Sequence, residues 1–237
     1  MRDISDDSHA VLDAESRERK ANKILTVLET RSDLPNAAVL DIGTGAGYIA
    51  AHIAKRVKYL ASVDRVDERK LTDGYEFKVV ADETLPFGPS SFDIVVSNHV
   101  IEHVEDQQKH VDEIIKVLRP GGLLYLATPN RLWITDPHYR VPFINWMPRV
   151  IATRYLYVTK GKTWDVRPVT TRRIRKHVAG RAQLEPIIVE IIKDPQQYHL
   201  DAFKALQPLT KRMPRPLLRV LSHASPTIIV VLKKSKI

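Results

Sequence analysis

The hydrophobic positions of the chain follow two patterns that alternate along the sequence. Short runs that are apolar at nearly every position indicate strands covered on both faces, and apolar positions spaced three and four apart among charges indicate amphipathic helices. The predicted helices are 9–30, 48–57, 111–118 and 169–182, and the predicted strands are 38–42, 59–63, 75–81, 92–97, 123–128, 184–192 and 227–232. This alternation predicts an α/β fold.

The first predicted strand leads into a glycine-rich turn. An acidic residue, Asp41, interrupts the otherwise apolar run, and Gly43, Gly45 and Gly47 follow at alternate positions. Glycine tolerates positive φ and lets a ligand approach the backbone, and a helix start behind it supplies free N–H groups. The turn is not the dinucleotide fingerprint, because the third glycine of Gly-x-Gly-x-x-Gly would fall at Tyr48. It therefore predicts a site for some other small polar ligand.

Acidic residues also follow the next two predicted strands. Asp64 lies about 20 residues beyond the glycines, the spacing at which a carboxylate accepts hydrogen bonds from ribose hydroxyls in nucleotide-binding α/β folds. Asp67 or Glu68 takes this role if the strand ends later. Asp82 and Glu83 follow the third strand, before a Leu-Pro-Phe segment.

These motifs together resemble the class I S-adenosylmethionine-dependent methyltransferases, and most of all the group that includes the ubiquinone-biosynthesis enzymes. The Glu-His-Val tripeptide at 102–104 and the Leu-Arg-Pro-Gly-Gly segment at 118–122 match this group in order and spacing. The resemblance implies a Rossmann-like, doubly wound, mostly parallel seven-stranded sheet, and S-adenosylmethionine as cofactor. The residues assigned to the cofactor are Asp41, Gly43, Thr44, Gly45, Gly47, Asp64, Asp82, Glu83, Asn98 and His99.

Within this resemblance, Asp82 faces the adenine amine, and Asn98 and His99 face the methionine end of the cofactor. His99 is a departure, since the group often has an acidic residue at this position. Methylation of base amines is not expected, because the segment 97–100 lacks the Asp/Asn-Pro-Pro-aromatic motif of those enzymes. No metal is expected either, since no carboxylate cluster follows the fourth strand and the chain has no cysteine.

The charge of the chain is divided unevenly. The net charge is +9, but residues 1–130 hold 16 Lys/Arg and 22 Asp/Glu, and residues 131–237 hold 21 Lys/Arg and 6 Asp/Glu. The basic half therefore predicts an anionic partner, whether a phosphate-bearing small molecule, nucleic acid or an acidic membrane face. The absence of cysteine, of a secretory signal and of a long apolar run predicts a cytoplasmic protein, at most peripheral to a membrane.

The sequence predicts one domain, 1–237, with two insertions. An N-terminal helical segment, 1–30, precedes a cofactor-binding core, 38–128. Residues 129–168 are aromatic, basic and irregular, which indicates a lid that binds the acceptor after the fifth strand. Residues 194–225 form the second insertion, before the last strand. Its mixed apolar and basic residues permit a membrane-surface helix, but its prolines favour packing over the lid.

We expect methyl transfer to a hydroxyl of a small or lipid-linked acceptor, such as an anionic sugar or quinol. Candidates for the general base are His99, His103 and His138. Two alternatives remain: an RNA methyltransferase that uses the basic half, and a non-catalytic module that binds a nucleotide or a partner. The sequence does not identify the acceptor or the oligomeric state.

Overall fold

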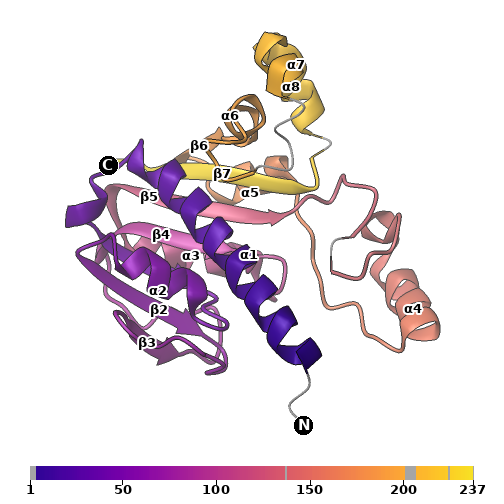
Figure 1. Ribbon diagram of the computed structural model, residues 1–237, viewed down its shortest axis with the longest axis horizontal. Helices are drawn as coiled ribbons and strands as arrows, with labels where there is room; N and C mark the ends of the chain where they lie inside the picture. The colour runs from indigo at the N-terminus through magenta and orange to yellow at the C-terminus, as the bar shows by residue number, and fades with distance from the viewer. Residues whose placement is uncertain (1–3, 137, 201–206, 224, 237) are drawn as a thin grey trace.

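A seven-stranded sheet forms the centre of the molecule in the computed structural model, which describes residues 4–136, 138–200, 207–223 and 225–236. The strand order is β3-β2-β1-β4-β5-β7-β6, and only β7 runs antiparallel to its neighbours (Figure 1). The strands are β1 Ala38–Ile42, β2 Tyr59–Asp64, β3 Glu76–Val79, β4 Phe92–Asn98, β5 Leu118–Pro129, β6 Ala182–Pro186 and β7 Thr227–Lys234. The predicted mostly parallel seven-stranded sheet is confirmed.

Helices cover both faces of the sheet. On one face lie α1 Ile4–Glu29, α2 Tyr48–Ala54 and α6 Ile188–Lys193, and on the other lie α3 Gln107–Val117 and α5 Thr171–His177. Neighbouring residues of one strand enter opposite cores, as Val39 does on the α1 side and Leu40 on the α3 side. This explains why the central strands are apolar at almost every position. A 3₁₀ turn, Leu34–Asn36, leads from α1 into β1.

One predicted strand is only partly correct. Residues 184–192 were expected to form a single strand, but β6 ends at Pro186 and α6 begins at Ile188. A continuous apolar run fits a buried strand or a buried helix equally well. Here Ile187 and Ile191 are both buried at a spacing of four, which is the helical solution. Proline has no N–H to donate, so Pro186 suits the end of an edge strand.

The segment 129–168 has more regular structure than its sequence indicates. It contains a 3₁₀ turn, Ile144–Trp146, and the helix α4, Arg149–Lys160. It also has a small core of its own, formed by Val141, Ile144, Ala152, Leu156, Trp164 and Val166. Figure 1 shows α4 at the far end of this segment, away from the sheet.

The second insertion contains α7 Gln207–Arg212 and α8 Arg215–Ser222, which pack against α6. Packing over the lid was expected, but Figure 1 shows these helices beside α6, on the other side of the sheet end from α4. The two insertions meet at Asn130, whose side-chain amide donates to the carbonyl oxygens of His223 and Ser225. Leu206, which the sequence places in this insertion, lies outside the described residues.

Candidate functional site

The glycine turn after β1 folds back onto the end of β2. The backbone N–H of Gly45 donates to Oδ2 of Asp64 over 2.7 Å. Gly43, Gly45 and Gly47 have φ values of 81°, 51° and 84°, which residues with a side chain rarely adopt. A Cβ at Gly43 would collide with Val100, whereas a Cβ at Gly45 would meet no atom within 4 Å. Gly45 therefore faces open space, in which a ligand can approach the backbone.

Thr44 and Gly47 support the turn. The Thr44 hydroxyl is buried and donates to the carbonyl oxygen of Val63 over 3.2 Å. Gly47 directly precedes α2, and a Cβ there would collide with the carbonyl oxygen of Leu71 and the hydroxyl of Tyr75. These two predicted cofactor residues hold the shape of the turn, and neither lines the cavity described below.

Asp41 is the one acidic residue of β1. Its side chain is buried, and its Oδ2 atom has no hydrogen-bond partner among the described residues. Burial, together with the nearby charge of Asp64, raises the pKa of Asp41 to about 7. A buried carboxylate oxygen without a partner is costly, so a cationic or donor group of a ligand would stabilise it.

A cavity of about 260 Å³ lies beside the turn. Its walls come from the carboxyl ends of β1 and β2, from the loops that follow β1, β2, β3 and β4, and from α3. It is lined by Ile42, Gly43, Gly45, Val63, Asp64, Arg65, Val80, Asp82, Glu83, Leu85, His99, Val100, His103, Val104 and His110. Six of the predicted cofactor residues therefore meet in one place, next to apolar side chains that suit the faces of an aromatic ring.

The carboxylates of the cavity have defined partners. Oδ1 of Asp64 accepts from the backbone N–H of Arg65 over 2.7 Å, and both of its oxygens keep a free lone pair. Asp82 accepts from the Lys109 ammonium and from the backbone of Thr84, which together hold its pKa well below the ordinary value. Oε1 of Glu83 accepts from the backbone N–H of Glu105 over 3.1 Å.

Asn98 and His99 occupy the end of β4 and its first loop position. Asn98 is paired with Ala127 in the sheet and does not line the cavity. His99 does, and it adopts φ of 62°, an uncommon value for a residue other than glycine. Its backbone N–H donates to the carbonyl oxygen of Ala127 over 2.8 Å, which fixes this conformation. Such local strain is often found at functional sites.

Glu102 is a central residue, and no pattern in the sequence indicates more for it than its place in the Glu-His-Val tripeptide. Its carboxylate is fully buried, with Oε2 accepting from the Thr128 hydroxyl at 2.9 Å and Oε1 lying 3.2 Å from Nδ1 of His99 and 4.0 Å from Nε2 of His138. The ligand atoms of His99, Glu102 and His138 all lie within 4.8 Å of one another, so these three side chains could hold a metal ion. No sequence pattern links Glu102 to His138, because they belong to different elements.

His138 and His103 connect the insertion to the loop after β4. Their rings meet edge to face with centroids 5.1 Å apart. Nδ1 of His138 lies 3.8 Å from Oδ2 of the buried Asp136, whose charge raises the pKa of His138 above its ordinary value. Nδ1 of His103 lies 3.8 Å from Oδ2 of Asp165. The structure thus places all three predicted histidines within one small region, with His99 and His103 in the cavity wall.

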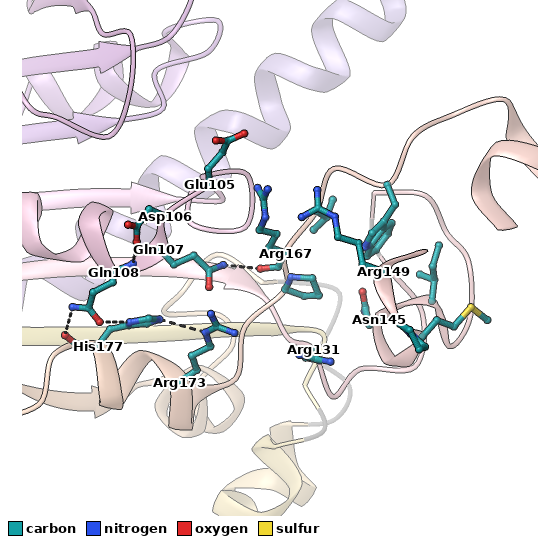
Figure 2. Close-up of a pocket in the computed structure, with 16 residues that line it drawn as sticks. Glu105, Asp106, Gln107, Gln108, Arg131, Asn145, Arg149, Arg167, Arg173 and His177 are labelled. Carbon is teal, nitrogen blue, oxygen red and sulfur yellow. Dashed lines mark hydrogen bonds between the residues drawn. The ribbon is translucent and has the colours of Figure 1, made fainter. Parts of the chain in front are cut away.

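A second, larger hollow of about 540 Å³ lies between the insertion, residues 105–108 and the helix α5. Figure 2 shows that its walls carry four arginines from different parts of the chain: Arg131, Arg149, Arg167 and Arg173. Within the described part of the chain, none of these four guanidinium groups forms an ion pair with a carboxylate. The hollow is therefore suited to an anionic group.

The loop 99–108 forms part of both hollows. His99 and His103 face the smaller cavity, and residues 105–108 line the larger one. The Gln107 side chain donates to the carbonyl oxygen of Arg167 over 2.8 Å (Figure 2) and to that of Ile101 over 3.0 Å. The backbone N–H of Arg167 donates to the carbonyl oxygen of Glu102 over 2.7 Å. The insertion is thus held against the wall that the two hollows share.

Solved structures with this fold come from several organisms. YcgJ from Bacillus subtilis aligns with a TM-score of 0.55 at 16% identity, over 91% of this chain and 98% of its own. An S-adenosylmethionine-dependent methyltransferase from Mesorhizobium loti aligns with a TM-score of 0.57 at 14% identity, over 87% of this chain and 95% of its own. At these identities the likeness establishes the fold alone, and it confirms the predicted Rossmann-like class.

Curated relatives match about half of the chain. A probable S-adenosylmethionine-dependent methyltransferase from Mycolicibacterium smegmatis is 40% identical over 101 residues, 40% of this chain and 38% of its own. The ubiquinone biosynthesis O-methyltransferase of Idiomarina loihiensis is 30% identical over 139 residues, 53% of this chain and 57% of its own. The chain thus matches about half of these relatives' length. A family model described as a methyltransferase domain matches residues 14–166, and the chain belongs to that family.

Proposed function

We propose that this protein is an S-adenosylmethionine-dependent methyltransferase that methylates a hydroxyl group of a small or lipid-linked, anionic acceptor. The observation that carries the proposal is the single cavity in which Gly45, Asp64, Asp82 and His103 meet. The names of the curated relatives support the same activity, and those of the ubiquinone-biosynthesis enzymes support oxygen as the acceptor atom.

The residues present fit the cofactor. The open space at Gly45 leaves room for it against the backbone, and the free lone pairs of Asp64 suit the two ribose hydroxyls. The apolar side chains of Val63, Val80 and Leu85 suit the adenine faces. Asp41 is buried and does not line the cavity, although its unpartnered Oδ2 atom would suit a donor group such as the cofactor's ammonium.

The cofactor, when bound, supplies an electrophilic methyl group on a sulfonium, so the protein's own task is to place the acceptor and remove its proton. We assign proton removal to His103, because it lines the cofactor cavity and also touches the insertion through His138. Oδ2 of Asp165 lies 3.8 Å from Nδ1 of His103, outside hydrogen-bond distance, and we assign it to orient the ring on closer approach so that Nε2 accepts the proton. His99 and His138 act as positioning residues, fixed by Glu102 and Asp136.

The acceptor is assigned to the basic hollow. The guanidinium groups of Arg131, Arg149 and Arg173, which have no carboxylate partner among the described residues, favour a phosphate or carboxylate on it. The shared loop 99–108 then places the reactive end of the acceptor next to the cofactor cavity.

The cofactor assignment is tested by calorimetric titration with S-adenosylmethionine. The wild type should bind, and Asp64→Ala should lose at least about tenfold in affinity, because two charge-assisted hydrogen bonds disappear. Asp67→Ala is the matched control, since this nearby carboxylate is exposed and pairs with Arg69. Equal binding by wild type and Asp64→Ala would remove Asp64 from the site.

The activity is tested with methyl-labelled cofactor added to separated lipid, small-molecule and RNA fractions. We expect label in the lipid or small-molecule fraction, and none there with His103→Asn, which should still bind the cofactor. Label in RNA would instead support the RNA methyltransferase alternative. Cofactor binding without label in any fraction would support a non-catalytic module.

A further inference from the structure

The insertion 129–168 exposes much of the molecule's apolar side-chain surface. Of the sixteen large hydrophobic side chains that are exposed in the described part of the chain, nine lie between residues 132 and 158. They are Leu132, Ile134, Phe143, Trp146, Val150, Ile151, Tyr155, Tyr157 and Val158. Scattered exposed apolar residues are ordinary, but a concentration of this kind in one short segment marks a contact surface.

The helix α4 carries an apolar face on its outer side. Ala152 and Leu156 point into the small core of the insertion and are fully buried. On the opposite side, Val150, Tyr157 and Val158 are 81%, 67% and 76% exposed. These positions are separated by seven and eight residues, which places them on one face of a helix. These exposures mean that no other element of the described residues covers this face, and Figure 1 shows α4 standing away from the sheet.

The charged residues of α4 are all basic. The helix contains Arg149, Arg154 and Lys160 and no acidic residue. Arg154 lies on the same outer face, four residues after Val150 and four before Val158. Among the described residues, neither Arg149 nor Arg154 has a carboxylate partner. An apolar face with unpaired cations in and beside it is complementary to an anionic lipid surface.

We infer that α4 docks on the surface of a membrane that contains anionic lipids, with Val150, Ile151, Tyr157 and Val158 inserted at the level of the headgroups. No helix among the described residues is long and apolar enough to cross a bilayer. A second copy of the chain fits this face less well, because a symmetric contact through α4 would bring unpaired Arg154 side chains together.

Membrane docking through α4 does not depend on the proposed function. Its consequence for the acceptor does rest on that function. Arg149, the first residue of α4, also lines the basic hollow. A membrane contact through α4 therefore brings the hollow next to the lipid surface, where the headgroup of a lipid-linked acceptor can enter it. For residues 194–225 the sequence permits a membrane-surface helix but favours packing over the lid. Among the described residues, more of the exposed large apolar side chains belong to the first insertion than to the second.

The docking is tested by sedimentation with vesicles, without cofactor or acceptor, so that its failure is separate from failure of the methyltransferase proposal. The full chain should bind vesicles of equal parts phosphatidylcholine and phosphatidylglycerol at least about tenfold more tightly than vesicles of phosphatidylcholine alone. The double variant Val150→Glu/Val158→Glu should reduce this binding at least tenfold, because it places two carboxylates in the inserted face. Arg154→Gln should reduce the difference in binding affinity between vesicles with and without phosphatidylglycerol.

Two matched controls locate the contact. Val79→Glu introduces the same charge at a 59% exposed position of β3, and Val220→Glu does so at a 68% exposed position of α8. Both should bind vesicles like the wild type, and thermal melting should show that all variants are folded. The inference is overturned if Val220→Glu loses binding while the α4 double variant keeps it. It is also overturned if the wild type does not bind anionic vesicles. The same holds if light scattering shows a wild-type dimer that is absent in the double variant, while neither protein binds vesicles.

Discussion

The backbone N–H of Gly45 and the Oδ2 atom of Asp64 are joined by a hydrogen bond of 2.7 Å. This bond ties the turn after β1 to the last residue of β2, so the two motifs that are 19 residues apart in the sequence form one wall. The geometry also leaves space on the side where a Gly45 side chain would lie. Substitutions can test the open space at Gly45 separately from the strain of its positive φ.

Gly45→Ala should weaken cofactor binding at least about tenfold, because the added methyl group occupies the open space beside the turn. Its φ of 51° also costs about 1 kcal/mol of stability for a residue with a Cβ. Gly161→Ala is the matched control, since Gly161 has a φ of 63° and open surroundings at the end of α4. Denaturant unfolding should show similar losses in both variants, and calorimetry should show weaker binding only in Gly45→Ala. Unchanged affinity in Gly45→Ala would argue against a ligand at this turn.

Asp41 should make the unligated protein less stable as pH rises. Its pKa of about 7 lies above the unfolded value near 3.8, so the folded state holds more protons between these values, and stability falls with rising pH in that window. Asp41→Asn should therefore be more stable than the wild type at pH 8, by roughly 2 to 4 kcal/mol, and the difference should shrink towards pH 4. Urea unfolding of both proteins at several pH values measures this. A difference that does not vary with pH would contradict the assignment.

The sequence predicts those site residues whose place in the fold follows from the pattern of apolar and polar residues around them. Asp64 and Asp82 follow strands, and parallel strands that end at the same edge of a sheet must bring such residues together. Glu102 and His138 are different, because their distance depends on how the insertion packs on the loop after β4, and no local pattern encodes this contact. The sequence does not predict α4 either, because aromatic and basic residues obscure the helical spacing of Ala152 and Leu156.

Zinc ions should inhibit the enzyme, although the sequence predicts no metal. His99, Glu102 and His138 offer two imidazoles and a carboxylate in a suitable arrangement, and zinc bound there would immobilise the positioning residues. Micromolar zinc should lower the methylation rate, more strongly at pH 8 than at pH 6 because the ligands must be deprotonated. His138→Ala should relieve the inhibition, and magnesium should have little effect because it prefers oxygen ligands.

The methylation rate without added zinc should not fall when a chelator is added, because we expect His99, Glu102 and His138 to act without a bound metal. Loss of activity with chelator, restored by zinc, would instead identify the cluster as a native metal centre. Inhibition that persists unchanged in His138→Ala would place the zinc elsewhere.

Neutralising the arginines of the basic hollow should weaken acceptor binding without slowing the chemical step. Arg131 and Arg173 face the hollow, and neither pairs with a carboxylate among the described residues, so each is free to bind the acceptor's anionic group. Arg131→Gln and Arg173→Gln should each raise the acceptor KM about 10- to 100-fold, as expected for a charge-assisted hydrogen bond, and leave kcat within about twofold. Arg175→Gln is the control, since Arg175 is exposed on the same helix as Arg173 and does not line the hollow. Steady-state kinetics with the labelled acceptor at low and high salt measure the effect, which should be smaller at high salt because exposed charges are screened. A fall in kcat at unchanged KM would mean that the arginines act on the reacting atoms and that the anionic group binds elsewhere.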